Sequence, residues 1–145
     1  MNRIFYVDGS CSNNGNYPNS AGFAVVEVNP STGEVLNHYA KRTINSTNNR
    51  EELKAILWVM LNYGNENPIV FSDSAYSVNT YTNWMFGWAK RGWLKSDKKP
   101  PENLDLIQAY YEYYQKGYRI QLEHCKGHAG NKYNELADRL AKGDL

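Results

Sequence analysis

Two aspartates directly follow short apolar runs, a placement that suits metal binding or acid–base chemistry. Asp8 follows the β-rich run Arg3–Val7, and Asp73 follows Pro68–Ser72. If these runs are parallel neighbouring strands, both carboxylates emerge at one sheet edge, where open α/β sheets commonly bind ligands. Each aspartate alone is better explained as a cap on the turn or helix that follows it, and only the occurrence of two such strands makes a site an equal alternative. The pair therefore indicates a site only if further acids converge on the same edge.

Two adjacent glutamates, Glu51 and Glu52, open the first predicted helix. Helical geometry separates their side chains by about 100°. Relative to an apolar stripe centred near Met60, Glu52 lies on the flank and Glu51 lies opposite. We therefore expect Glu52 to lean over the sheet edge and Glu51 to lie in solvent, so that Glu51→Gln does little. Either glutamate is also explained as a first-turn acid favoured by the helix dipole. The stripe consists of Leu53, Ile56, Leu57, Met60 and Leu61.

The last predicted helix and the loop before it carry two further candidates. Asp138 shares a helix face with Asn134, four residues away. Periodicity alone does not bring that face to Asp8. His128 lies in the glycine-flanked loop Lys126–Gly130. A loop histidine can move protons near neutral pH, although in isolation a solvated loop histidine is the simpler explanation.

Four acids without a suitable histidine or cysteine cluster favour a hard cation, Mg²⁺ or Mn²⁺, held by oxygen ligands. Two such ions about 4 Å apart could clamp the attacking water and the leaving oxygen of a phosphodiester. A single carboxylate pair would instead suit glycoside hydrolysis. The segment Gly87–Pro101 is basic and rich in tryptophan. That composition favours a polyanionic substrate, although it also suits a solvated basic loop anchored by its tryptophans.

The elements that must position these residues alternate between strands and helices. Three runs rich in β-formers read as an antiparallel meander, and later apolar runs alternate with helical periodicity. The order βββαβααβα implies a mixed sheet with helices packed on it. The predicted strands are Arg3–Val7, Gly22–Val28, Val35–Thr43, Pro68–Ser72 and Tyr118–His124. The predicted helices are Asn49–Tyr63, Ser74–Met85, Glu102–Gln115 and Asn131–Lys142.

Length and composition bound the molecule. The 145 residues are enough for one domain, which we expect to span 1–145. The net charge is +1, so any affinity for nucleic acid must come from a local patch. The chain shows no membrane-spanning run and no signal-peptide pattern, and we expect it in the cytoplasm. Cys11 and Cys125 have no paired spacing, which favours reduced thiols.

Five stretches, in order, resemble the type 1 ribonuclease H family over essentially the whole chain. They read YVDGSC at Tyr6–Cys11, TNNREEL at Thr47–Leu53, SDS at Ser72–Ser74, GWAKRGW at Gly87–Trp93 after Trp84, and KGHAG at Lys126–Gly130 with NELAD at Asn134–Asp138. Any one motif is weak, whereas five in order are specific. The resemblance implies an α/β ribonuclease H-like fold: a five-stranded mixed sheet, three strands antiparallel plus two parallel, flanked by helices.

The same resemblance implies the activity and the metal site. It implies an endonuclease that hydrolyses the RNA strand of RNA–DNA hybrids with two Mg²⁺ ions, or Mn²⁺ in their place, leaving 5′-phosphate and 3′-hydroxyl ends. The implied metal ligands are Asp8, Glu52, Asp73 and Asp138, with His128 assisting turnover. We expect a monomer whose partner is the hybrid. The alternative is a non-catalytic hybrid-binding module of the same fold.

The resemblance also assigns contacts to each strand of the hybrid. The implied RNA contacts are Asn14, Asn48 and Asn49, and the implied contacts to a DNA phosphate are Thr47 and Asn83. A basic handle would bind the DNA strand through Trp88, Lys90, Arg91 and Trp93. Glu135 would assist beside the outer metal ion. Only the RNA strand carries 2′-hydroxyls, which distinguish it from DNA. Two positions depart from the family pattern. The loop Ser12–Ala21 is of the longer type, and Ala75 replaces a polar side chain.

Overall fold

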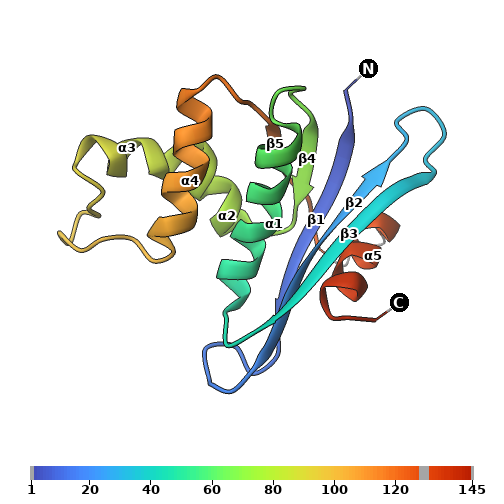
Figure 1. Cartoon of the computed structure of the whole chain (residues 1–145), viewed down its shortest axis with the longest axis horizontal. Coiled ribbons are helices and arrows are strands. Elements are labelled where there is room, and N and C mark those ends of the chain that lie inside the picture. The colour runs from blue at the N-terminus through green and yellow to red at the C-terminus, as the bar shows by residue number, and fades with distance from the viewer. Residues whose placement is uncertain (1, 128–130, 145) are drawn as a thin grey trace.

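Five strands form one mixed sheet in the order β3-β2-β1-β4-β5 (Figure 1). The computed structural model describes residues 2–127 and 131–144. Strands β1 (Ile4–Cys11), β2 (Ser20–Val28) and β3 (Val35–Ile44) form an antiparallel meander. Strands β4 (Ile69–Ser72) and β5 (Gln121–His124) extend the sheet in parallel with β1. The predicted fold class is confirmed.

Helices cover both faces of this sheet. The long helix α1 (Asn48–Tyr63) crosses one face and packs against α4 (Leu104–Gln115), while α5 (Lys132–Ala141) packs against β1 and β2 on the other face (Figure 1). After β4 the chain forms α2 (Ala75–Asn79), a π-helical turn (Thr80–Trp84) and α3 (Met85–Lys90). Within the described ranges, no helix combines the length and the apolar character needed to cross a membrane.

The two faces bury apolar clusters of different size. Along β1 the side chains alternate, so Phe5 and Val7 join the cluster under α1, whereas Tyr6 packs against the cluster under α5. The cluster under α1 is large and rich in aromatic side chains. The cluster under α5 is small and consists of Ala24, Val26, Val28, Ala137, Leu140 and Ala141.

Three predicted boundaries are wrong. The fifth strand begins at Gln121 and not at Tyr118. Strand β1 does not end before Asp8 but continues to Cys11, because β2 pairs with it as far as Cys11 and Ala21. The helix predicted to end at Met85 continues to Lys90 through the π-helical turn. The hydroxyl of Thr80 donates to the carbonyl of Tyr76 at 2.8 Å, and such bonds to the preceding turn distort a helix without ending it. The first residues of the basic segment are therefore helical.

Candidate active site

Strand register brings the first two aspartates together. Strands β1 and β4 are parallel, and their pairing ends at Val7 and Ser72. The residues that follow this last pair are Asp8 in β1 and Asp73 just after β4, so both carboxylates leave the same edge of the sheet. One carboxylate oxygen from each of Asp8, Glu52 and Asp73 lies within 4.8 Å of the other two. The convergence predicted from the sequence is therefore present for these three acids.

A glycine allows Glu52 to reach this edge. Gly9 lies under the first turn of α1, and a Cβ at this position would clash with the backbone of Glu51 and Glu52. Its backbone N–H donates to Asp8 Oδ1 at 2.9 Å and also to Glu52 Oε1. One backbone donor thus orients two of the three clustered carboxylates.

Burial and neighbouring negative charges make the carboxyl groups of Asp8 and Glu52 poor acids. Burial, with the charges of Asp73 and Asp138, raises the pKa of Asp8 to about 8. Burial, with the charges of Asp8 and Asp73, raises the pKa of Glu52 well above its usual range. A divalent cation would remove this repulsion, and an all-carboxylate donor group fits Mg²⁺ or Mn²⁺. Burial and the charges of Asp73 and Asp8 raise the pKa of Cys125 to about 11, so its thiol is protonated at neutral pH.

The fourth acid faces the other three across a cavity of about 440 Å³. Asp138, on α5, does not join the tight three-acid cluster but lines the same cavity. Its Oδ2 atom lies 3.0 Å from Nζ of Lys142, one helical turn further on. The cavity is lined by Asp8, Gly9, Ser10, Cys11, Asn48, Glu52, Asp73, Asp138 and Lys142.

The prediction for Glu51 is wrong. Glu51 is completely buried, whereas Leu61, assigned to the apolar stripe, is 39% exposed. The predicted stripe was centred on the large side chains and left out Ala55 and Val59, both fully buried. These two follow Glu51 at intervals of four residues, so the buried face of α1 extends to Glu51. Glu52 then lies near the middle of that face.

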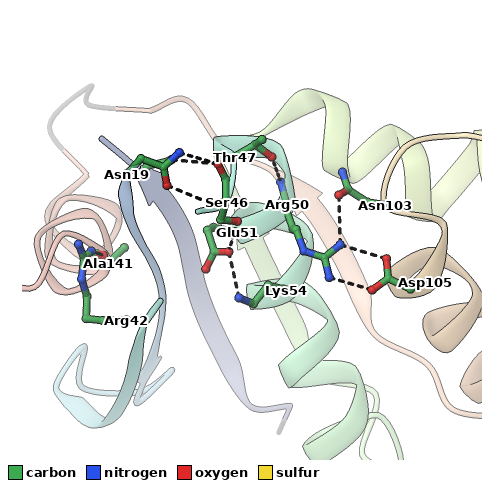
Figure 2. Close-up of polar contacts among 11 residues, drawn as sticks. Asn19, Arg42, Ser46, Thr47, Arg50, Glu51, Lys54, Asn103, Asp105 and Ala141 are labelled. Atoms are coloured by element: carbon green, nitrogen blue, oxygen red, sulfur yellow. Dashed lines mark hydrogen bonds and ion pairs between the residues drawn. The ribbon is translucent and has the colours of Figure 1, made fainter. Parts of the chain in front are cut away.

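A buried polar network surrounds Glu51 (Figure 2). Its Oε2 atom accepts from Ser46 Oγ at 2.6 Å and from Lys54 Nζ at 2.9 Å. The side-chain amide of Asn19 bonds both backbone groups of Ser46, at 2.9 and 3.0 Å. The network therefore ties the loop before β2 to the start of α1, which carries Glu52.

The predicted RNA contacts lie together beside the cavity. The backbone N–H of Asn48 donates to Asn14 Oδ1 at 2.8 Å, so the β1–β2 loop rests on the start of α1. Asn14, Asn48 and Asn49 are exposed.

The two predicted DNA phosphate contacts lie at different helices. Thr47 is the N-cap of α1, and its side chain accepts from Arg50 N at 3.1 Å. Asn83 is exposed on the π-helical turn.

The predicted handle is partly anchored to α4. Lys90 ends α3, and Lys90 and Arg91 are exposed. Trp93 is half-buried and contacts Tyr111 edge-on, with 5.2 Å between ring centroids. Trp88 is also half-buried. The contact with Tyr111 anchors Trp93 to α4, which is the alternative role considered for the tryptophans of this segment. Lys90 and Arg91 are exposed and available to a ligand.

His128 lies outside the described residues. Gly127, the residue before it, lies against Asp73, where a Cβ would come within 2.9 Å of Oδ2. Glu135 is exposed in the first turn of α5.

Sequence reasoning missed several residues around the site. Lys142 carried a usable signal, because Asp138 and Lys142 are four residues apart on one helix. Asn19 and Ser46 carried none, since their pairing depends on two loops that are distant in sequence.

Comparison with known proteins gives one consistent family. The RNase H family model matches residues 1–145. The ribonuclease H of Thermoanaerobacter sp. (strain X514) is 38% identical over 138 residues, covering 94% of this chain and 84% of that relative. The solution structure of the PFV RNase H domain matches with a TM-score of 0.84 and 25% identity, over 97% of this chain and 92% of that one. LC9-RNase H1, a type 1 RNase H with the type 2 active-site motif, matches with a TM-score of 0.75 and 28% identity. The match covers 99% of this chain and 73% of that one.

Proposed function

The chain belongs to the ribonuclease H family, and on this premise we propose that it is a metal-dependent endonuclease that hydrolyses the RNA strand of RNA–DNA hybrids. The observation that carries the proposal is the convergence of Asp8, Glu52 and Asp73, with Asp138 on the same cavity. The products would be 5′-phosphate and 3′-hydroxyl ends. We propose residues 1–145 as one catalytic domain.

We propose that the four acids hold two Mg²⁺ ions, with Mn²⁺ as a substitute. Asp8, Glu52 and Asp73 fit a shared hard-cation site because each offers a carboxylate oxygen to one small volume. Asp138 would complete the second position, with Glu135 beside it. Bound there, the ions would activate water and stabilise the charge that develops on the phosphodiester.

The protein's own groups would orient the substrate. The Gly9 N–H holds the carboxylates of Asp8 and Glu52 in fixed directions before any substrate arrives. Asn14, Asn48 and Asn49 present amides that can both donate to and accept from a 2′-hydroxyl. Thr47 and Asn83 would contact a DNA phosphate, and Trp88, Lys90, Arg91 and Trp93 would contact the DNA strand. His128 would assist turnover by moving a proton or easing product release.

Substrate comparison tests the proposal. Labelled RNA–DNA hybrid, double-stranded RNA and double-stranded DNA of one sequence should be incubated with Mg²⁺ or Mn²⁺. We expect cleavage of the RNA in the hybrid only, with 5′-phosphate ends on the products. Equal cleavage of double-stranded RNA would contradict the proposed specificity. Binding of the hybrid without cleavage under either metal would favour the non-catalytic module instead.

Cytoplasmic location and a monomeric state stay predictions. Light scattering of the purified protein would test the second.

A further inference from the structure

A second hollow, of about 250 Å³, adjoins the catalytic cavity. The two share Ser10, Cys11 and Lys142, so one continuous surface leads from the four acids into this hollow. Its other lining residues are Ser12, Ser20 and Arg42. The described lining thus combines two cations with three hydroxyl side chains and includes no acid. The lining of this hollow is therefore positively charged, whereas four acids line the catalytic cavity beside it.

Arg42 is held at the wall of the hollow by the end of α5. Its Nη1 atom donates to the carbonyl of Ala141, and its Nη2 atom donates to Ser20 Oγ at 2.6 Å (Figure 2). Gly22, opposite Arg42 on β2, makes this possible, since a Cβ there would lie 2.6 Å from the Ala141 carbonyl oxygen. Among the described residues no carboxylate pairs with Arg42, so its positive charge is fixed in place and uncompensated.

Lys142 supplies the second cation, at the boundary between the two cavities. Its ammonium group has three donors, and Asp138 Oδ2, at 3.0 Å, occupies one of them. Lys142 is half exposed, with 52% of its side-chain surface accessible. The remaining donors can therefore meet a ligand in the hollow without loss of the pair with Asp138.

We propose that this hollow binds a backbone phosphate of the RNA strand, next to the phosphate that is cut. The proposal rests on the proposed function and adds a substrate subsite to it. A strand whose phosphodiester lies at the four acids has a further phosphate on each side, and the hollow lies on the surface that continues from those acids. There, Arg42 and Lys142 offer charge-assisted hydrogen bonds, and the hydroxyls of Ser10 and Ser20 offer neutral ones. The Ser12 hydroxyl already donates to the Ser20 carbonyl at 3.0 Å. The subsite would offset the repulsion between the strand and the acids and fix which phosphate is cut.

Neutralising Arg42 tests the subsite, and the neighbouring lysine provides a matched control. Lys41 lies on the opposite face of β3, where it lines a groove with Phe23 and Trp58. We expect Arg42→Met to weaken hybrid binding roughly three- to tenfold and to lower the slope of log affinity against log salt by about one. Lys41→Met should change neither. Equal effects of the two variants would overturn the proposal. Two controls identify an effect that comes only from loosening α5. Thermal unfolding of Arg42→Met measures any loss of stability, and Arg42→Lys keeps the positive charge.

A missing phosphate tests the subsite in the unaltered protein. A chimeric strand with a short block of ribonucleotides paired to DNA fixes the cleavage position. A nick with hydroxyls at both ends then removes one phosphate at a time, from the RNA-containing strand or from the DNA strand. We expect one position next to the cut to weaken binding in the wild type and to have no effect in Arg42→Met. Sensitivity of the DNA strand alone, or no sensitive position beside the cut, would overturn the subsite. Hybrid cleavage by the wild type would still support the proposed function in that case.

Discussion

The carboxylates of Asp8 and Glu52 are buried side by side and share one backbone donor, the Gly9 N–H. Burial and neighbouring charges raise the pKa of Asp8 from its ordinary 3.8 to about 8. Between these values the metal-free folded protein holds a proton that the unfolded chain has released. Because the folded state binds more protons, its stability must fall as the pH rises through this window.

Asp8→Asn should therefore abolish cleavage and stabilise the metal-free protein at pH 8. The amide oxygen can still accept from Gly9, while one buried negative charge is removed. We expect the free energy of unfolding at pH 8 to rise by at least about 1 kcal/mol, with a flatter dependence between pH 5 and pH 8. Urea unfolding in EDTA measures this effect. Retained cleavage, or a loss of stability across the whole range, would contradict the role given to Asp8.

Glu51 and Glu52 are adjacent, and we expect their substitution to affect different properties. Glu52→Gln removes a carboxylate from the three-acid cluster and should abolish cleavage while the fold persists. Glu51→Gln weakens a buried network with Ser46 and Lys54 and should lower the free energy of unfolding by roughly 1–3 kcal/mol. Its activity should stay near wild type below the melting transition. Urea unfolding and cleavage rates, measured on both variants, test the split, and the reverse pattern would show that the two roles are exchanged.

Among the elements, the handle combines an anchor with free charge. Trp93 packs on Tyr111 of α4, whereas Lys90 and Arg91 project from the end of α3. Replacing both cations with alanine should raise KM and leave kcat nearly unchanged, because uniform binding is lost. Lys41→Ala with Lys116→Ala, which removes the same charge elsewhere, is the control. An unchanged KM and salt slope in the handle variant would mean that these cations do not contact the DNA strand.

The sequence pattern predicted which strands and helices are present. It predicted less well where they end and which polar side chains they bury. Strands β2 and β3 and helix α4 lie within two residues of their predicted bounds, since segments rich in glycine, proline or asparagine flank them. The end of β1 was missed because pairing with β2, a contact distant in sequence, carries the strand past Asp8. Glu51 was misplaced because the predicted stripe left out Ala55 and Val59. Its polar partners Ser46 and Lys54 are also not recognisable from an apolar pattern. Asp138 needed the family resemblance, since periodicity does not report which helix meets which strand.

For the whole molecule, the acids come from elements on both faces of the sheet. Asp8 lies in β1, Asp73 directly follows β4, Glu52 lies in α1 and Asp138 lies in α5. A metal ion bound by these acids would connect both helical layers to the sheet and stabilise the folded state only. At a concentration one hundred times its dissociation constant, Mg²⁺ should add about 2.7 kcal/mol to the free energy of unfolding. Calorimetry should show a raised Tm in the wild type, and a much smaller rise in Asp8→Asn.

The small cluster under α5 has a kinetic consequence. Six buried residues, three of them alanines, form this cluster, and the half-buried Tyr6, Tyr133 and Leu136 pack against it. The cluster on the opposite face is larger and buries more aromatic side chains. Because apolar area sets the free energy of local opening, α5 should detach in sub-global fluctuations that leave the other layer folded. Amide hydrogens of α5 should then exchange faster than those of α1 in the native state. On heating, the fourth acid should leave the site first, so inactivation should begin below the temperature at which the aromatic layer melts. Coincident loss of activity and of near-ultraviolet dichroism would show that both layers unfold together.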